Sequence, residues 1–232
     1  KIDVVPNGIT VRLSPFRTEA EKRAFRRRYV ADNTPLVFYV GRVVFEKGVH
    51  VLVDAWPYVH EAMPKARLVI AGTGDYLEQV KQQARALNVS DSITFTGYIS
   101  DDDRDKLYRV ADVATFPSLY EPFGIVALEA MAAGCPVVVA STGGLSEVVT
   151  LHETGLTVYP NDSRSLAWGI LHTLHNPDWA AQRAQNALHE AEELYNWRQI
   201  AEATGTIYER TYADWRRETW GAELAPREEA DL

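Results

Sequence analysis

Short, continuous apolar runs alternate along the chain with longer segments in which apolar residues recur every three or four positions. The short runs are rich in β-branched and aromatic residues and end at Gly, Pro or Ser, which is typical of buried strands. The pattern predicts strands over residues 36–41, 66–72, 92–97, 112–118, 135–141 and 155–160. It predicts helices near residues 17–30, 48–61, 75–87, 102–110, 124–133 and 163–175.

The alternation of these elements predicts a parallel sheet. Strands that are apolar on both faces need helices on both sides, and strands separated by helices form βαβ units. We therefore expect a doubly wound, Rossmann-like α/β domain over residues 1–177. Residues 178–220 are expected to form C-terminal helices, near 179–195 and 197–219, and residues 221–232 a flexible tail. The second of these helices has an aromatic stripe at helical spacing, which is more typical of a docking surface than of a cofactor site.

Composition and charge exclude several classes of protein. The chain has 232 residues and a formal net charge of -8, which argues against a general nucleic-acid binder. Its one cysteine, Cys135, cannot form an internal disulfide; we expect it in the core, and a cytoplasmic location fits this cysteine usage. No apolar run is long enough to span a membrane, and no signal-peptide pattern is present. Because the chain begins with Lys1, we expect it to be a piece of a longer protein.

Ligands of an open parallel sheet bind at the loops that leave the carboxyl ends of the strands. In the first such loop, Gly41 ends a strand, and Arg42 and Lys47 are cations suited to a diphosphate. The helix that follows Gly48 adds the positive potential of its N-terminus. The alternative is a solvated loop in which Lys47 pairs with a nearby glutamate.

The next two loops carry weaker signals. Gly72-x-Gly74 is half of a dinucleotide-binding fingerprint, and we interpret it as a tight turn from strand to helix. Gly97 and Tyr98 follow a strand and could meet a nucleobase edge. The acids of residues 101–103 match an Asp-x-Asp metal motif, but they precede a helix, where acids cap N–H groups, and we favour capping.

Residues 118–144 are almost wholly apolar, yet they contain Glu121 and Glu129. A buried carboxylate is costly unless it is paired. We expect Glu121 in a loop and Glu129 inside the following helix, both facing one cleft, where a polyol could satisfy them. The N–H groups of Phe123, Gly124 and Ile125 could meet an anion at that helix start. The alternative is that each glutamate caps a helix or forms an ion pair.

Small and polar residues flank this region. Ser118 closes the preceding strand, and Thr142, Gly143 and Gly144 follow the next one, where two glycines allow close approach to the backbone. His172 and the neighbouring His175 are interpreted as a surface pair, with no metal site expected. Neither a nucleophilic triad nor a Walker-type phosphate loop is present in the sequence.

The motifs together, in their order, resemble those of retaining glycosyltransferases of the two-Rossmann-domain (GT-B) class. Within that class they are most similar to the broad family that includes glycogen, starch and sucrose synthases. The resemblance covers about residues 1–175. The stretches that carry it are VVPNGI (4–9), VGR to EKG (40–48), LVIAGTG (68–74), FTGYI (95–99), PSLYEPFGIVALEAMAAGCPVV (117–138), STGG (141–144) and ETGL (153–156).

The resemblance implies roles for these residues. It assigns the donor-sugar hydroxyls to Glu121, the ribose hydroxyls to Glu129, the diphosphate to Arg42 and Lys47, and the base to Tyr98 and its neighbours. Gly41, Gly97, Ser118, Phe123, Gly124, Ile125, Thr142, Gly143 and Gly144 complete the expected donor site. The cations would do the work of a metal, so no cofactor is expected.

The resemblance also implies partners. A donor-binding half would need an N-terminal acceptor domain, on which its C-terminal helices would pack back. It would also need a nucleotide sugar and a glycan acceptor, and would transfer a hexose with retention. ADP- or UDP-glucose and an α-glucan fit best, although many glycogen synthases have Cys where Phe123 stands. The alternatives are a non-catalytic nucleotide-sugar module, a sugar-nucleotide epimerase and a glucan phosphorylase.

Overall fold

A computed structural model describes residues 2–11 and 14–217. The expected tail at 221–232 lies outside these residues. The described chain folds around a six-stranded sheet in the order β3-β2-β1-β4-β5-β6, with every neighbouring pair parallel. The strands are β1 (Leu36–Val40), β2 (Arg67–Ala71), β3 (Ile93–Gly97), β4 (Val113–Phe116), β5 (Val137–Ala140) and β6 (Leu156–Val158). Every strand that the sequence predicts is confirmed, as is the doubly wound α/β fold.

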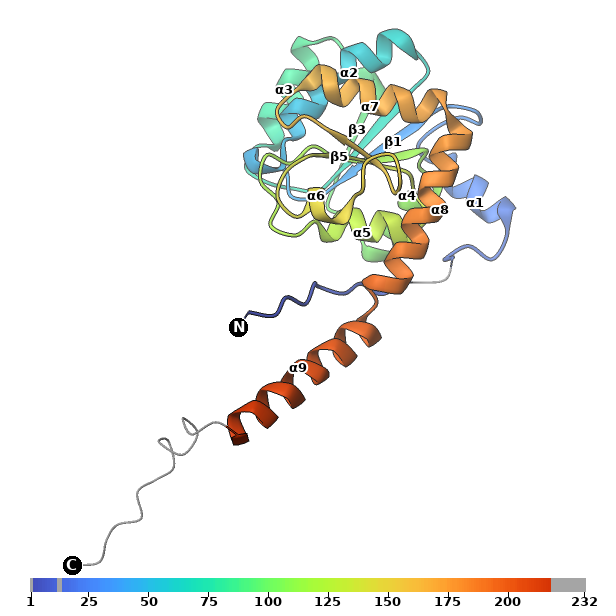
Figure 1. Ribbon diagram of the computed structural model, residues 1–232. Coiled ribbons are helices and arrows are strands. Elements are labelled where there is room, and N and C mark those ends of the chain that lie inside the picture. Colours follow the sequence, from blue (N-terminus) through green and yellow to red (C-terminus); the bar gives the residue numbers. More distant parts are fainter. Residues whose placement is uncertain (1, 12–13, 218–232) are drawn as a thin grey trace, which may run out of the picture.

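Helices cover both faces of the sheet (Figure 1). The described helices are α1 (Glu19–Arg26), α2 (Val49–Ala62), α3 (Leu77–Ala86), α4 (Asp101–Val110), α5 (Ile125–Ala132), α6 (Leu145–Val148), α7 (Ser163–His175), α8 (Pro177–Leu194) and α9 (Trp197–Arg217), with short 3-10 turns at Phe45–Lys47 and Ser90–Ser92. One core lies under α2, α3 and α7, and the other under α1, α4, α5, α6 and α8.

Strand β1 shows why the strands are apolar throughout. Leu36 and Phe38 belong to one core, whereas the alternating Val37 and Tyr39 belong to the other. Because successive side chains point to opposite faces, a strand in the middle of two helix layers has no solvent face. Cys135 is buried as expected, and burial raises the pKa of its thiol far above the ordinary value.

Several boundaries differ from the sequence-based expectation. Strand β4 ends before Pro117, which has no N–H to donate to a sheet. Helix α1 begins only after Thr18, whose hydroxyl accepts a hydrogen bond from Glu21 N at 3.1 Å. Helix α6 is a single turn that the periodicity does not reveal, because four residues are shorter than one repeat of an amphipathic pattern.

The two C-terminal helices take different positions. Helix α8 packs along α5 and buries Ala187 and Ala191 in the core. The chain turns at Tyr195, whose carbonyl accepts from Ile9 N at 2.6 Å, and α9 then extends away from the α/β domain (Figure 1). Its aromatic side chains Tyr208 and Tyr212 are exposed. The expected packing of C-terminal helices against a further domain stays a prediction.

Candidate functional site

The turns after β1 and β2 lie directly against each other. Val43 N donates to Thr73 O at 2.8 Å, and Gly72 adopts a φ of +131°. A methyl group at Gly72 would overlap the carbonyl oxygen of Gly41, and one at Gly74 would overlap that of Val43. These glycines are therefore needed for close packing of two loops, which supports the tight-turn interpretation of Gly72-x-Gly74.

Tyr39 holds the loop after β1 in place through a hydrogen bond. Its hydroxyl donates to the carbonyl oxygen of Arg42 at 3.0 Å, and its ring is buried. Burial and, second, the Glu121 carboxylate raise the pKa of Tyr39 well above its usual value, so the hydroxyl keeps its proton. Tyr39 is not among the residues expected from sequence, because an aromatic residue inside a strand is ordinarily core.

The loop after β1 also docks onto the loop after β4. Leu119 N and Tyr120 N both donate to Glu46 O, at 2.8 and 3.2 Å. Gly48 has a φ of +65°, and a methyl group there would overlap the carbonyl oxygen of Pro117. This contact places the side chain of Lys47 near Glu121, in the apolar stretch of residues 118–144.

Lys47 and Glu121 form an ion pair at the meeting point of these loops. The distance from Lys47 Nζ to Glu121 Oε2 is 2.6 Å, and the two side chains are 20% and 10% exposed. The expected cation and the expected sugar-binding carboxylate are therefore in direct contact. The alternative drawn from sequence, a lysine paired with a nearby glutamate, is also met, although this pair is largely buried.

The loop after β5 forms hydrogen bonds with the backbone of Glu121 and its neighbours. Gly144 N donates to Glu121 O at 2.9 Å, and Thr142 Oγ1 donates to Leu119 O at 3.2 Å. A methyl group at Gly143 would overlap the Glu121 carbonyl oxygen, and one at Gly144 the Phe123 backbone. The space beside these two glycines is thus filled by the protein's own backbone. Glycine is needed here for close packing of the chain, whereas the sequence led us to expect close approach of a ligand.

Helix α5 starts beside the ion pair. Gly124, its N-cap residue, has a φ of +97° and no side chain to accept hydrogen bonds from the first turn. Ile125 opens the helix and is 41% exposed, whereas Ser118 is buried. The start of α5 therefore presents positive potential three residues after Glu121.

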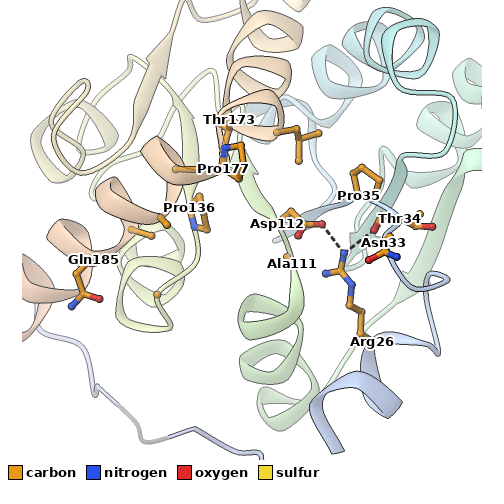
Figure 2. A pocket seen from close by; sticks show the side chains of 15 residues that line it. Arg26, Asn33, Thr34, Pro35, Ala111, Asp112, Pro136, Thr173, Pro177 and Gln185 are labelled. Carbon is orange, nitrogen blue, oxygen red and sulfur yellow. Dashed lines mark hydrogen bonds and ion pairs between the residues drawn. The ribbon is translucent and has the colours of Figure 1, made fainter. Parts of the chain in front are cut away.

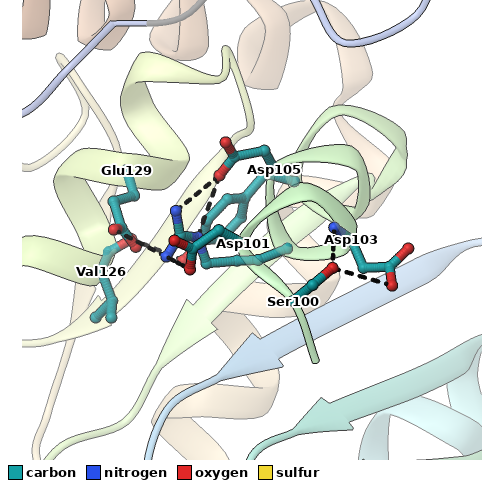
Figure 3. A network of polar contacts seen from close by, with 8 residues as sticks. Ser100, Asp101, Asp103, Asp105, Val126 and Glu129 are labelled. Atoms are coloured by element: carbon teal, nitrogen blue, oxygen red, sulfur yellow. Dashed lines mark hydrogen bonds and ion pairs between the residues drawn. The ribbon is translucent and has the colours of Figure 1, made fainter. Parts of the chain in front are cut away.

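Glu129 lies one turn into α5 and pairs with Arg104 of α4. Arg104 Nη1 is 3.3 Å from Glu129 Oε1 and 3.0 Å from Asp101 Oδ1, and Nη2 is 2.9 Å from Asp105 Oδ1. Figure 3 shows the carboxylates of Glu129, Asp101 and Asp105 converging from the two helices. Arg104 is not among the site residues expected from sequence. An arginine inside the acidic first turns of a helix, just past the carboxyl end of a strand, was the available signal.

The acids at the start of α4 lie in its first turn, where they favour the helix dipole as expected, but the capping oxygen belongs to Ser100 and not to an acid. Ser100 Oγ accepts from Asp103 N at 3.1 Å, and Asp102 pairs with Lys106 Nζ at 2.5 Å. Within residues 2–11 and 14–217, no group of three or more His, Cys, Asp or Glu side chains is placed to hold a metal ion.

Two cavities flank Arg104. One, of about 240 Å³, is lined by Gly41, Arg42, Gly72, Tyr98 and Arg104 among others. The other, of about 410 Å³, is lined by Glu129, Ile125 and Arg104, and also by residues that lead into and out of the domain, Gly8 and Trp197. The structure thus brings Gly41, Arg42 and Tyr98 together, as expected. Gly97 precedes Tyr98 with a φ of +69°, and a methyl group there would meet no atom of the described chain within 4 Å.

A further cavity, of about 690 Å³, lies at the opposite edge of the sheet, where β1, β4 and β5 begin (Figure 2). Arg26 spans part of it, with Nη2 at 2.7 Å from both Thr34 O and Asp112 Oδ2. Asp112 Oδ2 also accepts from Leu36 N at 2.7 Å. These contacts fasten α1 to the sheet, so we assign the polar groups of this cavity to structure.

Comparison with known proteins gives concordant matches. Residues 21–190 match the family described as glycosyl transferases group 1. The chain is 40% identical over 214 residues to an uncharacterised glycosyltransferase of Methanocaldococcus jannaschii, covering 90% of this chain and 54% of that protein. It is 36% identical over 208 residues to a glycogen synthase of Mycobacterium tuberculosis, covering 90% and 48%.

A solved structure agrees with these matches. The crystal structure of Anabaena HepE in complex with UDP and glucose superposes with a TM-score of 0.80 at 26% identity, covering 89% of this chain and 56% of that one. The chain spans about half the length of the curated relatives it matches. None of the helices in the described residues is long and apolar enough to cross a membrane.

Proposed function

The chain belongs to the glycosyl transferases group 1 family, and from this premise we propose that it binds the donor of a hexosyl transfer. The donor is a nucleoside diphosphate sugar, held where the loops leave the carboxyl ends of the strands. The hexose passes to an acceptor hydroxyl with retained configuration, as the family resemblance implies. An acceptor domain beyond this chain completes the enzyme.

The observation that carries the proposal is the contact between Lys47 and Glu121. A donor sugar has hydroxyl groups a few bonds away from its diphosphate, so its site needs a carboxylate and a cation side by side. Lys47 Nζ and Glu121 Oε2 meet this requirement at 2.6 Å. Negative charge develops on the leaving diphosphate as the glycosidic bond breaks, and Lys47, Arg42 and the α5 N-terminus stabilise it.

The rest of the donor follows from the same arrangement. The base occupies the cavity beside Gly41 and Tyr98, and Glu129 accepts hydrogen bonds from the ribose hydroxyls. We propose glucose as the hexose, with ADP or UDP as its carrier and an α-glucan as acceptor. The likeness to a glycogen synthase and to a protein solved with UDP and glucose supports this choice. Because many glycogen synthases have Cys at the position of Phe123, nucleotides of other hexoses are included in the test.

Calorimetry with ADP-glucose, UDP-glucose, GDP-mannose and the free diphosphates tests the proposal. We expect one glucose nucleotide to bind, and to bind more tightly than its diphosphate. Glu121→Ala is expected to remove the increment due to the sugar, and Glu129→Ala to weaken sugar nucleotide and diphosphate equally. If no nucleotide binds, the proposal fails. Sugar-independent binding together with a silent Glu121→Ala variant would instead indicate a plain nucleotide-binding module.

The same titration separates enzymes with other chemistry on this fold. A glucan phosphorylase would prefer glucose 1-phosphate and phosphate to any nucleotide. A sugar-nucleotide epimerase would convert the sugar without an acceptor, which chromatography of the incubated nucleotide sugar detects. Neither outcome is expected.

Donor binding is expected to need no divalent metal, because Lys47, Arg42 and the start of α5 already supply positive charge to the diphosphate. Addition of EDTA should change the calorimetric affinity for the preferred nucleotide sugar by less than about twofold, which is under 0.5 kcal/mol at roughly 1.4 kcal/mol per tenfold. Excess magnesium or manganese serves as the converse experiment. A large gain in affinity with either ion would show that a metal takes part.

A further inference from the structure

Arg104 links the two helices that border the nucleotide side of the site. It lies on α4, and its guanidinium contacts Asp101 and Asp105 of the same helix. The same Nη1 that binds Asp101 also contacts Glu129 on α5, so the guanidinium bridges the helices. Its side chain is 20% exposed and that of Glu129 is 24% exposed.

Two further carboxylates surround the contact between Arg104 and Glu129. Asp101 and Asp105 approach the same guanidinium, so Arg104 lies between the Glu129 carboxylate and two like charges. Burial lowers the pKa of Arg104, but Glu129, then Asp105 and Asp101, outweigh this effect, and the pKa lies above its usual value. The guanidinium therefore remains charged and compensates the carboxylates.

The planar guanidinium of Arg104 also fixes the directions of its hydrogen bonds. Nε and Nη2 both donate to Asp105 Oδ1, at 3.1 and 2.9 Å, which anchors one edge of the guanidinium to α4. The remaining nitrogen, Nη1, is then aimed at Glu129. Lysine could supply the charge but not this anchored geometry.

We propose that Arg104 is the positioning residue for Glu129 and that it orients the carboxylate so that both ribose hydroxyls of the donor nucleotide can donate to it. The proposal rests on the proposed function. It assigns Arg104 an effect on nucleotide affinity that passes through Glu129 and the ribose. A contact of Arg104 with the base is the rival explanation, because Arg104 lines the base cavity as well as the cavity that contains Glu129.

Calorimetry with a natural diphosphate and its 2′,3′-dideoxy counterpart separates the two explanations. The probe is UDP, ADP or GDP, whichever the wild-type chain binds most tightly. Arg104→Gln is expected to weaken the ribonucleotide by about tenfold, the effect of one misplaced charged hydrogen bond, and the dideoxynucleotide by less than about twofold. Glu129→Gln should show the same selectivity, and the double variant should lose little more than either single variant.

Arg104→Lys is the second variant, because it retains the positive charge that the carboxylates require for folding. It should lose about threefold for the ribonucleotide, between wild type and Arg104→Gln. Lys106→Gln is the matched control. It removes a cation of α4 that pairs with Asp102 of the same helix and lies 5.9 Å from the centre of the Phe25 ring of α1, so both nucleotides should bind as in wild type.

Each outcome bears on a different claim. An equal loss of ribonucleotide and dideoxynucleotide affinity in Arg104→Gln and Arg104→Lys would overturn the positioning role in favour of direct contact. Unchanged ribonucleotide affinity in both variants would overturn it as well. If the wild-type chain binds none of the three diphosphates, the proposed function fails first. If it binds one and Glu129→Gln is silent, the ribose assignment fails while donor binding stands.

Discussion

Replacing Lys47 with Met is expected to weaken binding of the nucleoside diphosphate sugar by at least about tenfold and to lower the free energy of unfolding by about 3 kcal/mol. The affinity falls because the diphosphate loses a charge-assisted hydrogen bond. The stability falls because the buried Glu121 carboxylate, whose side chain is 10% exposed, loses the Lys47 ammonium at 2.6 Å and is left without this countercharge. Calorimetry and urea unfolding measure the two effects separately.

Lys81→Met is the matched control for this prediction. Lys81 Nζ lies 2.6 Å from Glu78 Oε1, the same distance as in the buried pair, but Glu78 is 69% exposed. Water can replace the lysine there, so the unfolding free energy should change by less than about 1 kcal/mol and the affinity should not change.

The double variant Lys47→Met with Glu121→Gln tests the cause. Removing the Glu121 charge should restore part of the lost stability, because a neutral amide costs less to bury than an unpaired carboxylate. It should not restore affinity. Equal loss of stability in the Lys47 and Lys81 variants would contradict the importance of burial, and undiminished affinity in Lys47→Met would remove Lys47 from the donor site.

Replacing Gly48 with Ala is expected to destabilise the fold by about 3 kcal/mol or more and to weaken donor binding. The left-handed backbone, with φ +65°, costs a non-glycine residue about 1–2 kcal/mol, and overpacking adds about 1–3 kcal/mol. The added methyl overlaps the Pro117 carbonyl oxygen, which is backbone and cannot rotate away. The two loops must separate, and Lys47 moves away from Glu121 as they do.

Gly134 isolates the steric part of this effect. Its φ is +69°, almost that of Gly48, but a methyl group there would meet no atom of the described chain within 4 Å. Gly134→Ala should therefore cost only the backbone term of about 1–2 kcal/mol and leave donor affinity unchanged. Equal losses of stability in the two variants would mean that the loops after β1 and β4 do not need their close contact.

The fold follows from local signals that are strong in this chain. Strands such as β1 and β5 have apolar side chains on both faces, and only a sheet between two helix layers accommodates that pattern. Helix α4 has both its capping serine, Ser100, and its acidic first turn within a few residues of each other. Boundaries are less certain, as α1 and α6 show, because the end of an element depends on one or two contacts rather than on a repeat.

The site is predictable only in part. Glu121 and Glu129 can be selected from sequence because a charged residue in an apolar stretch must have a partner. The identity of that partner cannot be predicted from the sequence, because Lys47 lies 74 positions before Glu121. Arg104, which pairs with Glu129, is surrounded by acids in its own helix and reads as a solvated charge cluster.

By itself the sequence determined the doubly wound α/β fold and singled out Glu121 and Glu129 as charged residues in an apolar stretch. Only the tertiary structure decided that Lys47 meets Glu121, that Arg104 bridges to Glu129, and that Gly143 and Gly144 make room for backbone. The physical reason is range. Periodicity and capping act over a few residues, whereas ion pairs and close backbone contacts form wherever the sheet brings separate loops to the same edge.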